Sequence, residues 1–138
     1  MIKKILLWIW QLPQNLVAVI ILLIHHKEVQ KVESFQYPVW VIPSWDSWSA
    51  GVSLGDYILL APKHVSLTTV KHEHGHQIQS TYLGPLYLIV VGFTSAICNN
   101  LWDRLFHKEW KAKDRIKWYY SRFPEKWADE LGGVPSRW

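Results

Sequence analysis

An apolar run over residues 5–24, broken at its centre, constrains the fold of this chain more than any other feature. Residues 11–15, Gln-Leu-Pro-Gln-Asn, put three amide side chains and a proline in the middle of the run. A straight membrane-spanning helix needs about 20 apolar residues, and polar groups at mid-bilayer need partners within the protein. Residues 25–28, His-His-Lys-Glu, stand where a signal peptide would have small residues. We therefore expect residues 1–27 to be a membrane segment of two short helices bent at Pro13, re-entrant or interfacial, rather than one span.

A second apolar stretch covers residues 84–98 and has no charged side chain. As a helix it would be about 22 Å long, which is short against a hydrocarbon core of about 30 Å. The chain also contains ten tryptophans, a residue that concentrates at membrane–water interfaces. These features predict a membrane-associated chain whose apolar segments dip into one leaflet or pack as a hydrophobic base.

A chain of 138 residues fits a single domain. The formal charge of +4 would suit an anionic surface, but the basic residues follow no nucleic-acid-binding pattern, so we expect no nucleic acid partner. Cys98 is the only cysteine, which excludes an internal disulfide and a cysteine-based zinc site. Any metal ion must therefore be held by histidines and carboxylates.

The remaining pattern predicts a mixture of helices and short strands, an α+β fold. Residues 37–42 and 52–60 are rich in β-branched and aromatic residues, with residues 43–48 as the loop between them. Residues 66–69 offer several N-cap oxygens for a helix that continues to about Tyr82. A further helix is expected from Asn99 or Asn100 to about Tyr120. The last helix has Pro124 near its first turn and Gly132-Gly133 after its end.

The candidate chemistry lies in the helix that follows residues 66–69. His72, Glu73 and His76 form an HExxH pattern. Residues four apart on a helix share one face, so His72 and His76 can bind one Zn²⁺ while Glu73 reaches a water beside it. The alternative is an ordinary polar helix face without a metal.

A catalytic zinc site normally has three protein ligands, so a third ligand must come from elsewhere. Glu125 and Asp129 lie one helical turn apart in the last helix. Glu125 can bind the metal, and Asp129 can accept the second ring N–H of a ligating histidine. Two alternatives remain open. The pair can be a solvated face that bonds Lys126 and Arg122, or the third ligand can be Asp129, Glu130 or His107.

These residues resemble the paired motifs of the gluzincin metallopeptidases, HExxH followed by ExxxD. The HExGH helix that leads into Gly84-Pro85-Leu86-Tyr87-Leu88 is also similar to that of small uncharacterised bacterial membrane-associated proteins. The resemblance implies a minimal zincin-like core, with a short antiparallel sheet, the HExxH helix and the ExxxD helix. It also implies a zinc-dependent endopeptidase-like site in which residues 52–60 are the strand that borders the substrate. The chain is much shorter than familiar gluzincins, so the resemblance covers two helices and one strand.

We expect a membrane-associated zinc metallopeptidase. His72, His76 and Glu125 would bind Zn²⁺, Glu73 would act as the catalytic base, and Asp129 would support a ligand. The expected partners are a peptide or protein substrate and membrane lipid. If both apolar segments crossed the bilayer, the two motif helices would lie on opposite sides, so we expect neither to span. The site is then expected near the cytoplasmic interface of the inner membrane. The alternative is a non-catalytic membrane protein with a structural or regulatory metal.

Overall fold

Four short strands form one mixed sheet in the computed structural model, which describes residues 1–47 and 51–137. The strands are β1 (Gln30–Val32), β2 (Val39–Val41), β3 (Gly51–Leu54) and β4 (Tyr57–Leu60), in the order β1-β2-β4-β3. The fold is α+β, as the sequence predicts. The expectation of an antiparallel sheet is wrong, because β2 pairs with β4 in parallel, with Val39 opposite Ile58. The chain passes through the short helix η1 (Pro43–Ser47) and β3 before β4, so β4 runs in the same direction as β2.

The expected strand over residues 52–60 is instead a hairpin of β3 and β4. Gly55 makes the turn with a φ of 61°, a backbone conformation that glycine adopts without strain. The hairpin places β3 at one edge of the sheet and the apolar β4 in its interior. The first expected strand, residues 37–42, corresponds to β2. Of the expected loop over residues 43–48, residues 43–47 form η1, and Trp48 lies outside the described residues.

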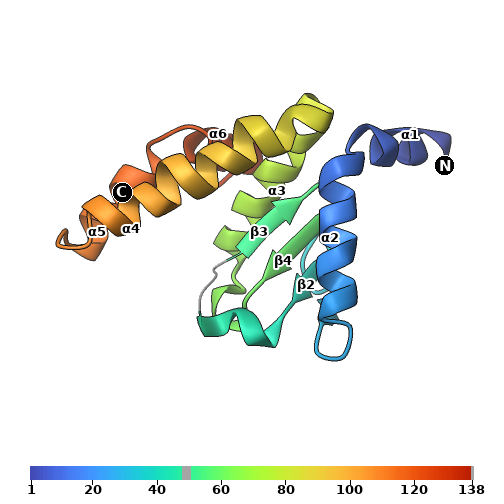
Figure 1. Cartoon of the computed structure of the whole chain (residues 1–138), viewed down its shortest axis with the longest axis horizontal. Coiled ribbons are helices and arrows are strands. Elements are labelled where there is room, and N and C mark those ends of the chain that lie inside the picture. Colours follow the sequence, from blue (N-terminus) through green and yellow to red (C-terminus); the bar gives the residue numbers. More distant parts are fainter. Residues whose placement is uncertain (48–50, 138) are drawn as a thin grey trace.

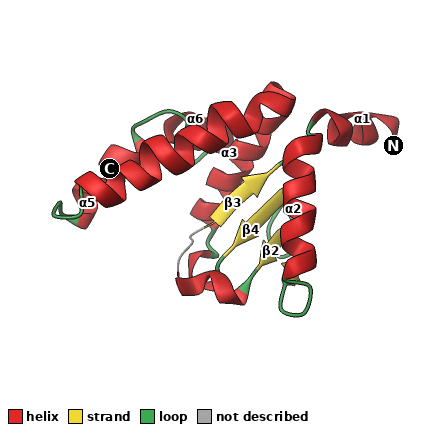
Figure 2. Ribbon diagram, viewed as in Figure 1, coloured by secondary structure: helices red, strands yellow, loops and turns green. Residues whose placement is uncertain are grey.

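Helices cover both faces of the sheet (Figures 1 and 2). On one face, α2 (Leu12–Ile24) contributes Ala18, Ile21 and Leu22 to a core with Leu54 and Leu59. On the other face, α3 (Leu67–Leu83) contributes Val70, which packs in the core against Val39, Val41, Ile58 and Leu60. Both central strands are therefore buried on two sides, which explains their continuous apolar sequence.

The polar break in the first apolar run is a bend between α1 (Ile2–Trp10) and α2, and the two helices meet at 88°. The bend lies at Gln11, two residues before the expected position, and Pro13 occupies the first turn of α2, where its missing N–H is not needed. Gln14 Nε2 donates to Ser80 Oγ (2.8 Å) and to the Gly84 carbonyl (2.9 Å). Asn15 Oδ1 accepts from the Asp56 amide (2.9 Å). The nitrogens of the three amides and Asn15 Oδ1 thus find partners inside the protein, whereas Gln11 Oε1 and Gln14 Oε1 are buried without a partner among the described residues.

Within the described ranges, 1–47 and 51–137, the structure contains no individual helix with both the length and the apolar character needed to cross a membrane. Two sharply bent helix pairs meet the same criteria of length and composition. They are α1 with α2, and residues 67–86 with residues 88–106, the second pair bent by 119°.

The HExxH helix α3 begins where the sequence predicts, because the Ser66 hydroxyl accepts the Thr69 amide (3.2 Å) as an N-cap. A short 3₁₀ helix, η2 (Pro62–His64), precedes it, and another, η3 (Gly84–Leu86), follows it. The π-helix η4 (Leu88–Leu101) then continues directly into α4 (Trp102–Phe106).

The expected helix start at Asn99 or Asn100 is wrong, and so is the single helix to Tyr120. Asn99 is buried inside η4, where its side chain donates to the Phe123 carbonyl (2.9 Å) and caps nothing. The helix ends at His107, and α5 (Ala112–Tyr120) is a separate element.

The last helix, α6 (Glu125–Gly132), begins after Pro124 as expected and includes Gly132, which the sequence predicts to follow it; Gly133, whose φ is 66°, caps its end. Its backbone touches that of α3. A Cβ atom added to Gly75 would lie 1.9 Å from the Ala128 carbonyl oxygen, and one added to Gly132 would lie 1.9 Å from that of Lys71. These small residues let the two motif helices meet although they are about 50 positions apart.

Candidate metal centre

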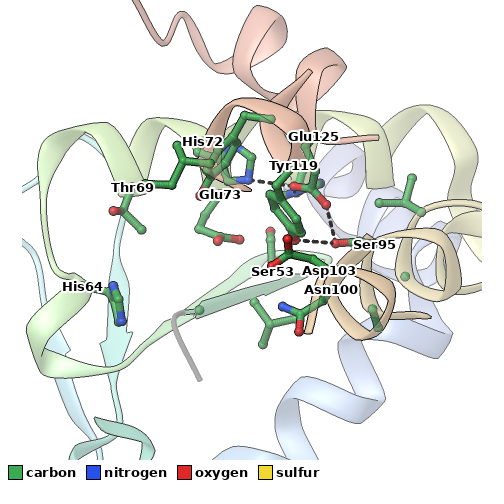
Figure 3. Close-up of a pocket in the computed structure, with 18 of the residues that line it drawn as sticks. Ser53, His64, Thr69, His72, Glu73, Ser95, Asn100, Asp103, Tyr119 and Glu125 are labelled. Atoms are coloured by element: carbon green, nitrogen blue, oxygen red, sulfur yellow. Dashed lines mark hydrogen bonds and ion pairs between the residues drawn. The ribbon is translucent and has the colours of Figure 1, made fainter. Parts of the chain in front are cut away.

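Two histidines of α3 and one glutamate of α6 converge on a single point, and Figure 3 shows His72 facing Glu125 there. Oε2 of Glu125 lies 3.1 Å from Nε2 of His72 and 3.2 Å from Nε2 of His76. One ligand atom from each of the three residues lies within 4.8 Å of the other two. In the described residues this is the only cluster of three or more such side chains close enough to hold a metal ion. His72, His76 and Glu125 are all buried.

Each histidine is oriented through its other ring nitrogen. His72 Nδ1–H donates to Asp129 Oδ1 at 2.7 Å, the contact predicted for Asp129. Arg137 in turn donates to both carboxylate oxygens of Asp129, at 2.7 and 2.9 Å. His76 Nδ1–H donates to Gln79 Oε1 at 2.7 Å. These contacts place the Nδ1 proton on the outer side of each ring, so each Nε2 can turn a lone pair toward a metal ion once the proton it shares with Glu125 is lost.

Glu125 is also fixed on its second oxygen. The Ser95 hydroxyl of η4 donates to Oε1, and the Tyr119 hydroxyl of α5 lies 3.3 Å from Ser95 Oγ (Figure 3). Oε1 is therefore held by Ser95, and Oε2 is the oxygen that faces the two histidines and can bind a metal ion. Gln79 adds a further tie, because its Nε2 donates to the Pro124 carbonyl (2.9 Å) directly before Glu125.

Glu73 has no such partners. Its side chain points into the cavity (Figure 3), and its Oε2 is buried without a hydrogen-bond partner among the residues described. Burial raises the pKa of Glu73, although His72 and His76 act in the opposite direction. A buried polar atom without a partner is costly, and Oε2 of Glu73 is such an atom beside the cluster.

The charges of the cluster are strongly coupled. Burial alone would lower the pKa of His72, but hydrogen bonds to Asp129 and Glu125 outweigh it and raise the pKa to about 9. Burial alone would raise the pKa of Glu125, but the two histidines hold it below its usual range. The metal-free site therefore favours a proton on His72 at neutral pH. A divalent cation bound by the three residues would replace the positive charge of this proton beside Glu125.

The donor set fits zinc in its chemistry. Two imidazole nitrogens and one carboxylate oxygen are typical ligands of a zinc site that leaves a coordination position for water. Oε2 of Glu73 lies beside this set without a hydrogen-bond partner among the described residues.

A cavity of about 690 Å³ opens beside the cluster. Its walls are β3, α3, the inner side of η4, and α5. The edge strand β3 lies close to Glu73, because a Cβ atom on Gly51 would be 3.3 Å from Glu73 Oε1. Farther along the same strand, the Tyr87 hydroxyl donates to the Ser53 carbonyl (2.9 Å). The space can therefore hold an extended chain next to Glu73.

The structure brings together His72, Glu73, His76, Glu125 and Asp129. Asp129, one of the alternative third ligands, contacts His72 Nδ1 instead of joining the ligand set, and the other two alternatives lie elsewhere. His107 bonds Asp103 and stacks on Trp110 at the turn after α4. Glu130 is exposed and lies 3.9 Å from Lys126. Neither joins the cluster.

Sequence reasoning missed Gln79, Ser95 and Arg137. Gln79 follows His76 by three positions, a helical spacing that could have revealed it. Ser95 and Arg137 meet the site only through the tertiary fold, so no local signal marks them.

Comparisons with known proteins found no match: no family model, no curated protein and no solved structure is similar to this chain. The geometry of the site therefore carries the functional argument.

Proposed function

We propose that this protein is a membrane-associated zinc metallopeptidase that hydrolyses peptide bonds in peptide or protein substrates. The observation that carries the proposal is the pairing of a His72, His76 and Glu125 ligand set with the buried, unpartnered carboxyl group of Glu73. The same pairing underlies the resemblance of the two motifs to those of gluzincins.

Zinc bound by these three residues would polarise the scissile carbonyl and make water acidic enough to attack it near neutral pH. Glu73 would accept a proton from the attacking water and deliver it to the leaving amine nitrogen. Its raised pKa suits both steps, because the carboxyl group must bind the proton and then release it.

The cavity supports a peptide substrate. The first two residues of the edge strand β3, Gly51 and Val52, are partly exposed and line it, and strand edges bind extended peptides through main-chain hydrogen bonds. A Cβ atom added to Gly51 of this strand would lie 3.3 Å from Glu73 Oε1. A peptide that pairs beside Gly51 would present a carbonyl next to Glu73.

The test combines metal analysis with a hydrolysis assay. The purified protein should contain about one zinc per chain, and His72→Ala and His76→Ala should lose it. Glu73→Gln should retain zinc and lose cleavage of a mixed peptide library, a loss of at least about 100-fold. Glu130→Gln makes the same chemical change on an exposed part of α6 and should retain both. Zinc binding with no cleavage in any variant would support the non-catalytic alternative. Unchanged metal content in the histidine variants would refute the site.

A further inference from the structure

The N-terminal helices expose an apolar surface. On α1 and the outer side of α2, eleven large apolar side chains are at least 37% exposed: Ile2, Ile5, Leu6, Ile9, Trp10, Leu12, Leu16, Val17, Ile20, Leu23 and Ile24. The inner side of α2 packs on the sheet, and the polar amides of the bend point into the protein. The outward surface of this pair is therefore apolar along its length.

A second apolar surface follows the outer side of η4 and α4. Its exposed side chains are Ile89, Phe93, Ile97, Leu101, Trp102, Leu105 and Phe106, preceded by Leu86 on η3. The opposite side of η4 carries Val91, Ser95 and Asn99, which face the cavity or are buried. The same helix thus borders the proposed active site on one side and is apolar and exposed on the other.

The two surfaces are joined. Trp10 Nε1 donates to the Thr81 carbonyl (3.0 Å), and a Cβ atom on Gly84 would lie 2.2 Å from the Trp10 ring. The end of α1 is therefore fixed to the turn between α3 and η4. Figure 1 shows α2 and the η4–α4 helix both in front of the sheet and α3. We call the exposed residues of α1, α2, η3, η4 and α4 named above the docking surface.

We propose that the docking surface inserts into one leaflet of an anionic membrane, the cytoplasmic leaflet. A monomeric protein rarely exposes so many contiguous apolar side chains. The two helix pairs are bent by 88° and 119° rather than straight, and helices with one apolar side can lie in a membrane interface with that side buried. Lys3 and Lys4 are the only charged residues of α1 and both are exposed, and lysines beside an apolar surface favour acidic headgroups.

A second copy of the chain fits this surface less well than lipid does. The chain carries a formal charge of +4, so face-to-face copies would bring like charges together at the lysines of α1. An anionic leaflet offers both an apolar interior and the opposite charge. The proposal concerns the docking surface alone, so it stands or falls independently of the metal and of catalysis.

The native Cys98 provides the test, because this only cysteine is exposed on η4 between Ile97 and Leu101. The full chain, purified in mild detergent, is labelled there with a polarity-sensitive fluorophore and mixed with phosphatidylcholine–phosphatidylserine vesicles. Emission should shift to shorter wavelength, and a quencher attached to lipid acyl chains should reduce it. The matched control carries the label at Leu67→Cys in a Cys98→Ala background. Leu67 is 60% exposed at the opposite end of α3, so its label should remain in water.

The lysines test the choice of leaflet. Replacing Lys3 and Lys4 by glutamine should weaken binding to the anionic vesicles by about 25-fold, from about fivefold per lysine, with little change for neutral vesicles. Lys126→Gln, on an exposed position of α6, should leave binding unchanged. A Cys98 label that stays in water on the vesicles, or shifts no more than the Leu67 control, would overturn the proposal. A label that is buried without lipid, with mass doubling in sedimentation, would assign the surface to a second copy instead.

Discussion

The Ser95 hydroxyl donates a hydrogen bond to Oε1 of Glu125, while Oε2 of the same carboxylate lies between the two motif histidines. Ser95 belongs to η4, so the helix that borders the cavity also orients the candidate third ligand. This contact fixes the rotation of a carboxylate that would otherwise offer either oxygen to a metal.

We predict that Ser95→Ala weakens zinc binding by about 10-fold, within the range seen when supporting partners of a ligand are removed. Ser95→Thr keeps the hydroxyl and should recover most of the affinity. Thr94→Ala removes a neighbouring hydroxyl that makes no contact with Glu125 and serves as the control. Competition with a chelating dye gives the affinities. Equal affinities for Ser95→Ala and the wild type would show that α6 alone positions Glu125.

Glu125→Ala should weaken zinc binding more than Asp129→Ala does. Glu125 would supply a ligand atom, whereas Asp129 acts through the His72 ring, and loss of such a partner costs about 10–100-fold. The same dye competition, on both variants in parallel, gives the order. If both residues were only a solvated face, each change would contribute about 0–1 kcal/mol and metal affinity would not move.

Zinc affinity should rise with pH up to about 9. In the metal-free protein His72 holds a proton below its pKa of about 9, and zinc binds only the neutral ring. Each zinc must then displace one proton, so affinity should increase about tenfold per pH unit between pH 7 and 9 and level off above. Asp129→Asn removes the carboxylate that stabilises the protonated His72 ring and so lowers the pKa of His72. The zinc affinity of this variant should therefore stop rising at a lower pH than that of the wild type. Calorimetry of zinc binding in two buffers of different ionisation enthalpy measures the number of protons released per zinc. An affinity independent of pH over this range would contradict the charge state of His72.

Gly75→Ala should destabilise the protein, because the added methyl group would meet the Ala128 backbone and push α6 away from α3. Such overpacking costs about 1–3 kcal/mol, and zinc affinity should fall with it. Gly92→Ala is the matched control, since the nearest atom to its added methyl group is 3.8 Å away. It should change stability by less than about 1 kcal/mol. Thermal unfolding in the same detergent compares the two variants, and equal midpoints would contradict the close helix contact.

The local features of the sequence predicted the parts of the fold that local physics determines. Ser66 caps α3, Gly133 ends α6, and the four-residue spacing of His72 and His76 puts both rings on one helix face. To predict the full ligand set from the sequence, one further premise was needed: that a zinc site has a third protein ligand. The structure brings Glu125 to that place through the small residues at Gly75 and Ala128.

The errors arose where partners distant in sequence decide the outcome. The turn at Gly55 looked like the middle of a strand, yet it is the point where Asn15 of α2 contacts the sheet. Asn99 looked like a helix cap, but Phe123 takes its hydrogen bond and the helix continues. The parallel pairing of β2 and β4 likewise depends on where β3 lies, which no local pattern encodes.

The double role of α2 affects how this protein can be produced and handled. Its inner side completes the core over Leu54 and Leu59, and Gln14 and Asn15 bond Gly84 and Asp56. Deleting residues 1–24 to obtain a water-soluble form would therefore strip one face of the sheet and leave these backbone groups unpaired. Polar substitutions confined to exposed positions, such as Ile20 and Leu23, are the route to a detergent-free sample that retains the fold.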